Sequence, residues 1–250
     1  MTRLSSPQIL ILAIGALSFT SPATAQDSPD FLFGPPSGMI GVRTGWLMAS
    51  ADSDIFRFVQ QHLTVDREDF NAPAFGVDLE LAMTPRASAV VGFDFSKTSK
   101  DSEYRDFVDN QRLPISQTTS LREIGFTGGV KFALTPRGRE VSSRAWIPAA
   151  VTPYAGGGGG ILRYDFVQFG DFIDVDDPRM AIFTDTFRSE GWTPSAHIFG
   201  GVDIKVWKRM YVSGEGRYQW SKATLGRDFI RFEPIDLAGF KATAGVHYMF

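Results

Sequence analysis

The sequence predicts an all-β fold, a single eight-stranded antiparallel up-and-down transmembrane β-barrel. Three observations support this prediction. Apolar and polar residues alternate with a period of two along eight segments of the chain. Short connections alternate with long ones, the layout of a barrel with tight turns at one end and loops at the other. The apolar faces read from these segments carry no charged residue, and a Lys or Arg facing lipid near the bilayer midplane costs about 2–4 kcal/mol.

The chain begins with the pattern of a secretory signal peptide, expected over residues 1–25. A basic residue, Arg3, precedes a short apolar stretch, and Ala23-Thr24-Ala25 supplies a small-x-small cleavage site. The stretch is too short for a spanning helix, so a retained anchor is the less favoured alternative. Residues 26–37 form a short Pro- and Gly-containing lead, and residues 38–250 are expected to form one outer-membrane barrel domain.

The composition excludes several classes of function. Hydrophobic residues make up 43% of the 250 positions and the net charge is −3, so the chain is neither disordered nor a nucleic-acid binder by bulk charge. Its 25 glycines and 13% aromatic residues suit strands and turns. Cysteine is absent, which excludes Cys-based metal sites and thiol chemistry, and no cofactor or metal is expected.

The expected strands and connections follow from the alternation. The strands are expected at residues 39–49, 74–84, 87–97, 117–134, 153–165, 194–206, 210–221 and 236–250. Tight turns at Met83–Ala87 and Trp207–Met210 join the second strand to the third and the sixth to the seventh, and a longer segment joins the fourth to the fifth. Long loops are expected at 50–73, 98–116, 166–193 and 222–235. Within the first loop, Ile55, Val59 and Leu63 predict a short helix.

Every second residue of each strand is expected to face lipid. In the second strand this face holds Phe75 and Val77, and in the fifth strand it holds Tyr154, Leu162 and Tyr164. The glycine run Gly156–Gly160 in the fifth strand is attributed to close packing and curvature of a narrow wall. Alternation alone would also fit a soluble barrel with its apolar side inward. The loop lengths, the signal peptide and the uncharged faces favour the membrane.

The opposite, polar face of the strands carries twelve charged residues. They are Arg43, Asp78, Glu80, Asp94, Glu123, Lys131, Arg163, Asp203, Lys205, Glu215, Arg217 and Lys241. The interior of an eight-stranded barrel is just wide enough for side chains to fill it. Six acids and six bases are therefore expected to pair across it as a plug, since an unpaired buried charge is costly. A narrow or gated polar pathway is the alternative.

The chain has three histidines, His62, His197 and His247, which are candidate catalytic bases. Ser195 and His197 share a strand face, as a nucleophile and a base could. Their parity places both in the lumen, away from lipid acyl chains, as it does His247, and His62 lies in the first loop. No enzymatic activity is therefore expected.

The third long loop contains apolar residues where a loop should be polar. They include Phe166, Phe169, Phe172, Ile182, Phe183 and Phe187. Such a surface must be covered or used. One interpretation is that the strands extend above the membrane and the loops pack on one another. The other is an apolar recess at the mouth of the barrel.

The last strand, AGFKATAGVHYMF, alternates up to a terminal aromatic residue, with Val246, Tyr248 and Phe250 on its apolar face. With the segment TPYAGGGGGILRYDF, it resembles the small eight-stranded outer-membrane barrels of the OmpA, OmpX and OmpW type. The resemblance implies an outer-membrane location in a Gram-negative-type bacterium, with outer-membrane lipids and lipopolysaccharide as neighbours. It also implies that Val246, Tyr248 and Phe250 form the signal read by the barrel-assembly machinery.

The resemblance to the OmpW type, the aromatic third loop and the balanced polar face lead to the expected function. We expect a non-enzymatic, porin-like barrel that binds or admits a small hydrophobic ligand at a loop-lined mouth, above a lumen largely plugged by charges. A structural or surface-interaction barrel, acting in adhesion or envelope integrity, is the main alternative. A lipid A-modifying enzyme is the third.

Overall fold

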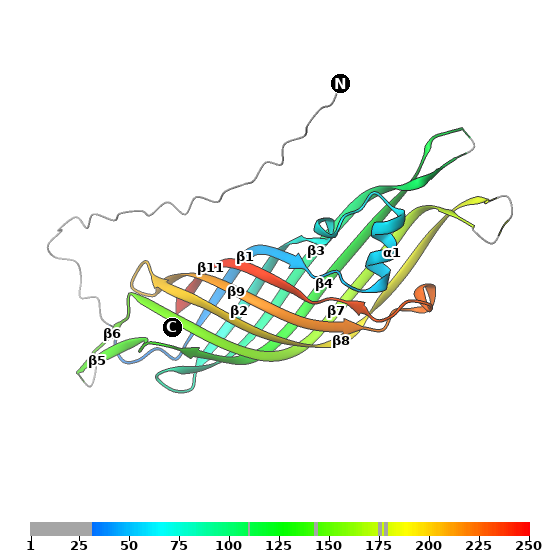
Figure 1. Ribbon diagram of the computed structural model, residues 1–250. Coiled ribbons are helices and arrows are strands. Elements are labelled where there is room, and N and C mark those ends of the chain that lie inside the picture. The colour runs from blue at the N-terminus through cyan, green and yellow to red at the C-terminus, as the bar shows by residue number, and fades with distance from the viewer. Residues whose placement is uncertain (1–31, 110, 143–144, 175–176, 178–179) are drawn as a thin grey trace, which may run out of the picture. The chain divides into compact units, whose positions relative to one another are not determined.

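Eight long strands close into a ring in the computed structural model, which describes residues 32–109, 111–142, 145–174, 177 and 180–250. The expected signal peptide and residues 26–31 of the lead lie outside these residues. The ring strands are β1 (Gly38–Ala49), β2 (Ala72–Ala82), β3 (Ala87–Val108), β4 (Pro114–Ala133), β7 (Val151–Ile173), β8 (Ile182–Lys205), β9 (Met210–Ala223) and β11 (Gly239–Met249). Each pairs antiparallel with the next, and β11 pairs back to β1, which closes the barrel (Figure 1).

The apolar residues of the alternating pattern face outward. Val42, Phe75 and Ile198 are 60%, 53% and 56% exposed, whereas the intervening Arg43 and Asp94 are buried in the lumen. A water-soluble protein does not expose a continuous apolar band of this kind, so the wall faces hydrocarbon. The predicted all-β fold, an eight-stranded antiparallel transmembrane β-barrel with its apolar side outward, is confirmed.

The fifth ring strand, β7, has the opposite orientation to the one predicted. Tyr154, Leu162 and Tyr164 point inward and are almost fully buried, while Ile161 and Arg163 point outward. The prediction failed here because five glycines occupy both faces, so the alternation that orients a strand is missing. The expected lipid-facing face of this strand is therefore lumenal, and Arg163 is not a lumen residue.

The glycine run lies where β4 and β7 pair side by side at close spacing. A Cβ atom added at Gly158 would overlap the carbonyl oxygen of Gly128 on β4, and one added at Gly160 would overlap that of Phe126. Only residues without a side chain can adopt this backbone spacing. The close packing attributed to these glycines from the sequence is present.

Two of the four expected loops are largely strand. β3 and β4 extend as a hairpin beyond the predicted ends of their strands, and so do β7 and β8. Expected loops 98–116 and 166–193 thus shrink to short tips. The pattern misled because outside the bilayer lipid no longer requires one uncharged face on each strand, so apolar residues no longer alternate regularly with polar ones.

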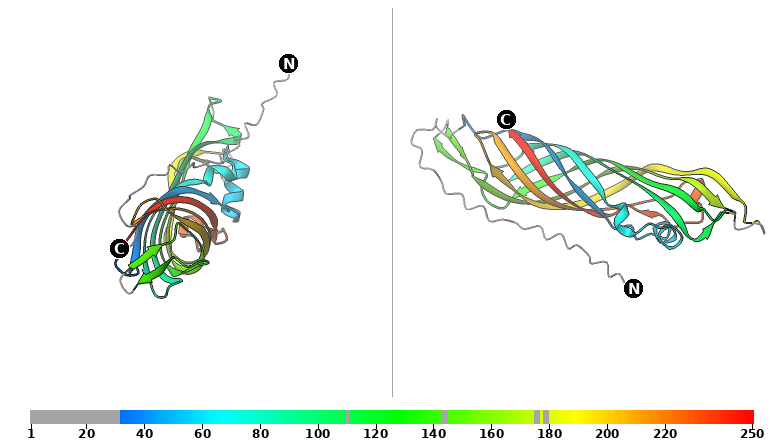
Figure 2. Two further views of the ribbon diagram at one scale, coloured as in Figure 1. Left: turned by 90° about the vertical axis from the view of Figure 1, so that its left-hand side faces the viewer. Right: turned by 90° about the horizontal axis from the view of Figure 1, so that it is seen from above.

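The end of the barrel from which the two hairpins extend is called the mouth here. The remaining loops cover it. The predicted helix is present as α1 (Asp54–His62), and η1 (Arg67–Phe70), η2 (Arg227–Phe229) and the short β10 (Ile235–Asp236) lie nearby. In the described residues, no helix is long and apolar enough to cross a membrane. Ile55, Phe56 and Val59 of α1 are fully buried in an apolar cluster with Phe166 and Phe229. Figure 2 shows the helix of this segment, in cyan, beside the end of the barrel away from the C-terminus. This cluster fills the mouth end of the barrel.

The opposite end, called the turn end, carries a feature absent from the prediction. The segment between β4 and β7 forms a hairpin of β5 (Gly138–Ser142) and β6 (Ala145–Pro148). Trp146 of β6 packs on Met39, Tyr211 and Met249, and its backbone pairs with Leu32 of the lead. The hairpin thus places an indole against the inner wall at this end.

Candidate functional site

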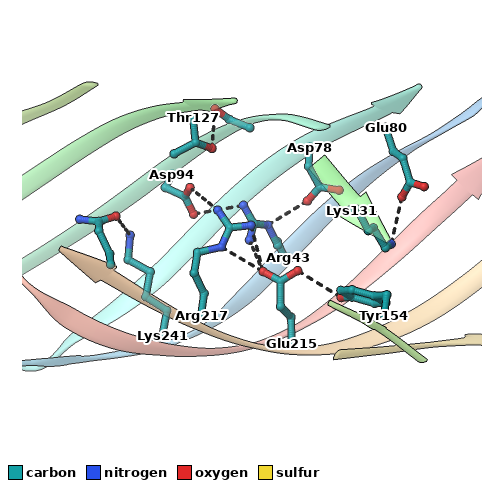
Figure 3. A network of polar contacts seen from close by, with 12 residues as sticks. Arg43, Asp78, Glu80, Asp94, Thr127, Lys131, Tyr154, Glu215, Arg217 and Lys241 are labelled. Carbon is teal, nitrogen blue, oxygen red and sulfur yellow. Dashed lines mark hydrogen bonds and ion pairs between the residues drawn. The ribbon is translucent and has the colours of Figure 1, made fainter. Parts of the chain in front are cut away.

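The lumen centres on one arginine that contacts three carboxylates. Arg43 Nε lies 2.8 Å from Asp78 Oδ1, Nη2 lies 3.2 Å from Asp94 Oδ1, and Nη1 lies 3.0 Å from Glu215 Oε1 (Figure 3). The acids come from β2 and β3, which are neighbouring strands, and from β9, which is separated from β1 by β11. The planar guanidinium donates hydrogen bonds to Glu215 and Asp94, while Asp78 contacts its Nε as an ion pair.

A second arginine completes this central group. Arg217 Nη2 lies 3.0 Å from Glu215 Oε1, and Nη1 lies 3.5 Å from Asp94 Oδ2. The hydroxyl of Tyr154 donates to Glu215 Oε2 at 3.1 Å. The Arg217 guanidinium also lies over the ring of Phe199, 5.0 Å from its centroid. Glu215 is therefore held by two cations and one phenol.

A separate group lies nearer the turn end. Lys131 Nζ lies 2.7 Å from Asp203 Oδ2 and 2.9 Å from Glu80 Oε2, above the ring of Tyr154. Arg137, from the segment between β4 and β5, lies 2.9 Å from the other oxygen of Glu80. The sequence analysis missed Arg137 because it lies outside any alternating strand.

The other expected lumen residues lie apart from these groups. Glu123 is buried, and its Oε2 has no hydrogen-bond partner in the structure; Lys241 Nζ is 3.4 Å from Gln219 Oε1. Lys205 is half-buried at the end of β8. His247 joins the network instead, with Nε2 3.0 Å from Asp78 Oδ2. Its inward parity predicts a place in the lumen, but the pairing with Asp78 was not predicted.

Little space remains beside the ion pairs. Two cavities, one beside the Lys131 group and one between the two groups, measure about 10 Å³ each. Room for one water requires about 10–15 Å³ on this measure. Side chains therefore fill the centre of the lumen.

A much larger cavity, called the mouth recess here, lies beside the apolar cluster at the mouth of the barrel. It has a volume of about 430 Å³ and lies among α1, the two extended hairpins and η2. Its apolar lining is Phe58, Leu63, Tyr104, Phe107, Phe172, Ile173, Phe183, Phe187, Phe229 and Phe232. The rings pack edge to face, as with Phe172 and Phe187 at 4.6 Å between centroids.

The recess also has a few polar groups. Gln117 Nε2 donates to the hydroxyl of Tyr104 at 3.1 Å and to the carbonyl of Asp171 at 2.9 Å. His62 Nδ1 lies 2.9 Å from the carbonyl oxygen of Phe58, and Asp228 lines the rim. Burial raises the pKa of Tyr104, so its hydroxyl stays protonated at neutral pH. An aromatic pocket with few polar groups suits a small, largely apolar molecule.

The structure divides the six residues expected at the mouth into three sets. Phe172, Phe183 and Phe187 line the recess. Phe166 is fully buried in the cluster beneath it. Phe169 and Ile182 point outward, away from the recess, because they lie on the outer face of the β7–β8 hairpin. The sequence analysis missed the contributions of α1 and η2, which come from other loops.

The residues weighed for catalysis are not arranged as a pair. Ser195 and His197 share the inner face of β8, but the structure records no hydrogen bond between them, and His197 Nδ1 has no partner. The His197 ring instead stacks on Phe199 at 5.8 Å. Among the described residues, no group of three His, Cys, Asp or Glu side chains is placed to hold a metal ion.

An eight-stranded ring with an apolar exterior and a charged, side-chain-filled interior is the architecture of small outer-membrane β-barrels, and this chain has that architecture. No family model and no curated protein matches the sequence. Three solved structures trace a similar chain path. They are Neisserial surface protein A (10% identity, 87% of this chain and 99% of that chain, TM-score 0.48), the outer membrane protein OprG from Pseudomonas aeruginosa (10%, 88% and 99%, 0.46) and Ail of Yersinia pestis (12%, 86% and 99%, 0.41). Similarities this distant carry no statement about function.

Proposed function

We propose that this chain is a non-enzymatic outer-membrane protein that binds a small, largely apolar molecule in the mouth recess. The observation that carries the proposal is the aromatic cavity of about 430 Å³ above a filled lumen. Pockets of this size and lining bury most of a small ligand, while a few polar groups fix its orientation. Gln117 and His62 would supply that orientation here.

The setting of the proposal is the outer membrane, with the mouth toward the outside. The signal-peptide pattern of residues 1–25 and the uncharged outer wall support export to a membrane. The final strand presents Val246, Tyr248 and Phe250 on its outer face, the arrangement that would serve as the assembly signal. Short turns toward the periplasm and long hairpins outside are typical of bacterial outer-membrane barrels.

The proposal favours binding over passage through the lumen. Phe166 and Phe229 of the apolar cluster form the floor of the mouth, and the Arg43 and Lys131 groups lie below it. A ligand in the recess would have to displace both layers to move inward. It would therefore exchange with the outside or with the adjacent lipid.

Binding can be tested with a small apolar fluorescent probe, N-phenyl-1-naphthylamine, added to the folded protein in detergent micelles. Phe187→Ser removes a ring from the recess, and losing a buried Phe contact of about 1.5–3 kcal/mol lowers affinity roughly tenfold or more. Phe169→Ser is the matched control, because Phe169 is 54% exposed outside the recess. Equal affinity of both variants and the parent protein would contradict the proposal.

A second candidate function is a contact with surfaces outside the cell. The tips of the two long hairpins expose Val108, Leu113 and Met180, apolar residues that reach beyond the recess. Replacing all three with Ser should then weaken adhesion to host cells or to neighbouring cells while leaving probe binding unchanged. Unchanged adhesion of this triple variant would contradict the second candidate function.

A further inference from the structure

Four neighbouring strands carry charged residues on the outer wall along one row of paired residues. Lys97 of β3 lies opposite Arg122 of β4 in the backbone register, and Arg122 lies opposite Asp165 of β7. Asp165 lies opposite Glu190 of β8. All four positions have the parity of the lipid-facing residues, so the charges point away from the barrel.

On each of these four strands, the charged position lies at the mouth-side end of the apolar outer face. One outward position nearer the turn end, Phe95 pairs with Ile124 and Arg163 pairs with Trp192. Phe126 stacks on Trp192 with 6.2 Å between the ring centroids. Aromatic residues concentrate where the hydrocarbon meets the headgroups. The charged positions therefore lie at the headgroup level of the leaflet on the mouth side.

Two acids hold three arginines side by side. Asp165 lies 2.7 Å from Arg122 Nη2 and 2.8 Å from Arg188 Nε. Glu190 lies 3.1 Å from Arg163 Nη2 and 3.0 Å from Arg188 Nη2. The three arginine side chains remain 38%, 41% and 49% exposed. Since each guanidinium has five donors, several N–H groups remain directed toward the surroundings.

The cluster has an excess of positive charge. Four bases, Lys97, Arg122, Arg163 and Arg188, stand against two acids, a difference of two, in a chain whose net charge is −3. Lys97 has no ion-pair partner within the part of the chain that the structure describes. On the described outer faces of β9, β11, β1 and β2, Lys222 is the one basic residue. The excess is thus confined to one side of the wall.

We propose that these four bases, the basic row, bind the phosphate groups of a phosphorylated glycolipid of the lipid A type in the surrounding leaflet. Arginine matches phosphate oxygens with two parallel hydrogen bonds, and a compact ammonium such as that of Lys97 adds a point charge. The acyl chains lie against the apolar surface directly below, formed by Phe95, Ile124, Phe126 and Ile161. The two acids orient the guanidiniums and do not neutralise the row.

The inference rests on the proposed outer-membrane setting and is independent of the mouth recess. Its test uses the full mature protein, folded in a zwitterionic detergent and titrated with diphosphoryl lipid A. Retention of the lipid is followed by native mass spectrometry, and the thermal unfolding midpoint is measured in parallel. We expect retention of the lipid and a higher midpoint. The double variant Lys97→Gln/Arg163→Gln should bind about tenfold less tightly, because charge-assisted hydrogen bonds to the phosphate groups are lost.

The matched control is Lys208→Gln/Arg209→Gln, which removes two charges from the tight turn between β8 and β9 at the opposite end. It should bind like the parent protein. Lys97→Gln alone breaks no ion pair, so it tests the row even if the double variant folds poorly. Lipid A stripped of its phosphates should not bind, and millimolar inorganic phosphate should not displace the lipid.

Equal binding by the two double variants, or equal binding of dephosphorylated lipid, would overturn the proposal. Displacement by inorganic phosphate would also overturn it, because the row would then be a site for free anions. Binding of the apolar probe to the Lys97→Gln/Arg163→Gln variant separates the two proposals. It should match that of the parent protein, whatever the outcome with lipid A.

Discussion

Arg43 and Glu215 are separated by 172 residues in the chain, and Nη1 of the first lies 3.0 Å from Oε1 of the second inside the barrel. Their strands, β1 and β9, are not hydrogen-bonded neighbours in the ring, because β11 lies between them. The contact therefore bridges the lumen itself. It makes the interior a support for the wall, in addition to the backbone ladder.

Removing one partner of this contact should destabilise the barrel. We expect Glu215→Ala to lower the free energy of unfolding by about 3 kcal/mol, because Arg43 and Arg217 lose a shared carboxylate in a buried setting. Asp101→Ala, at an exposed position bonded to Thr118, should cost less than about 1 kcal/mol. Urea unfolding in lipid vesicles, followed by tryptophan fluorescence, measures both. Equal midpoints would show that the lumen pairs do not support the wall.

The filled lumen should not conduct ions. The cavities beside the Arg43 and Lys131 groups are about 10 Å³ each, too small for a continuous column of water. We expect no steady single-channel current when the protein is inserted into a planar lipid bilayer. A stable, reproducible conductance would instead indicate a gated pathway through the ion pairs.

The close spacing of the paired strands β4 and β7 predicts opposite outcomes for two glycine substitutions. Gly158→Ala should strongly reduce the folded fraction, because its Cβ would overlap the carbonyl oxygen of Gly128 and neither backbone can move without breaking the ladder. Gly128→Ala should fold normally, since a Cβ there meets no atom within 4 Å. The heat-dependent shift of folded barrels on a denaturing gel measures the folded fraction. Similar behaviour of the two variants would contradict the close-packing explanation.

The first loop should lose stability in acid. The pKa of Asp69 is lowered, first by the hydrogen bond from the backbone N–H of Asp66 and then by the ammonium of Lys100, 2.9 Å away. A depressed pKa contributes stability that is fully present above the ordinary value near 3.8, and this is lost as the pH falls through the folded-state value.

Hydrogen exchange of the amides at 64–71, in the parent protein and in Asp69→Asn, measures this effect. At pH 6 the parent should be better protected than the variant, and the difference should shrink as the pH falls through the lowered pKa of Asp69 in the folded state. A difference that stays constant over this range would exclude the Asp69 carboxylate as its cause.

The fold class was predictable because lipid imposes a strict rule on one face of each strand. In seven of the ring strands the alternation is regular, and inward and outward residues agree with the structure; Phe75 outward and Asp94 inward are examples. In β7 the glycines remove the pattern, so the sequence wrongly predicts that its two tyrosines face lipid. The Tyr154 side chain instead points into the lumen, where its hydroxyl donates to Glu215. A tyrosine suits both environments, so the residue type alone could not decide.

The candidate sites were less predictable than the fold. Parity brings Arg43 and Asp78 to the same interior, but which charges meet depends on strand tilt and stagger, which a sequence pattern does not carry. The mouth recess depends on contacts between loops far apart in the chain, such as Phe58 of α1 against Phe232, with 5.5 Å between their rings. The hairpin that carries Trp146 is short and has no alternation that would predict it.

The pairing of β11 with β1 determines when the barrel can form. Met39 lies opposite Met249, so the two strands that meet here come from opposite ends of the barrel sequence. Until the ribosome has released the final strand, both margins of the sheet are unpaired and could join another chain. Closure is thus a late event with a large loop-entropy cost, and the exported polypeptide needs an escort that keeps it from aggregating on the way.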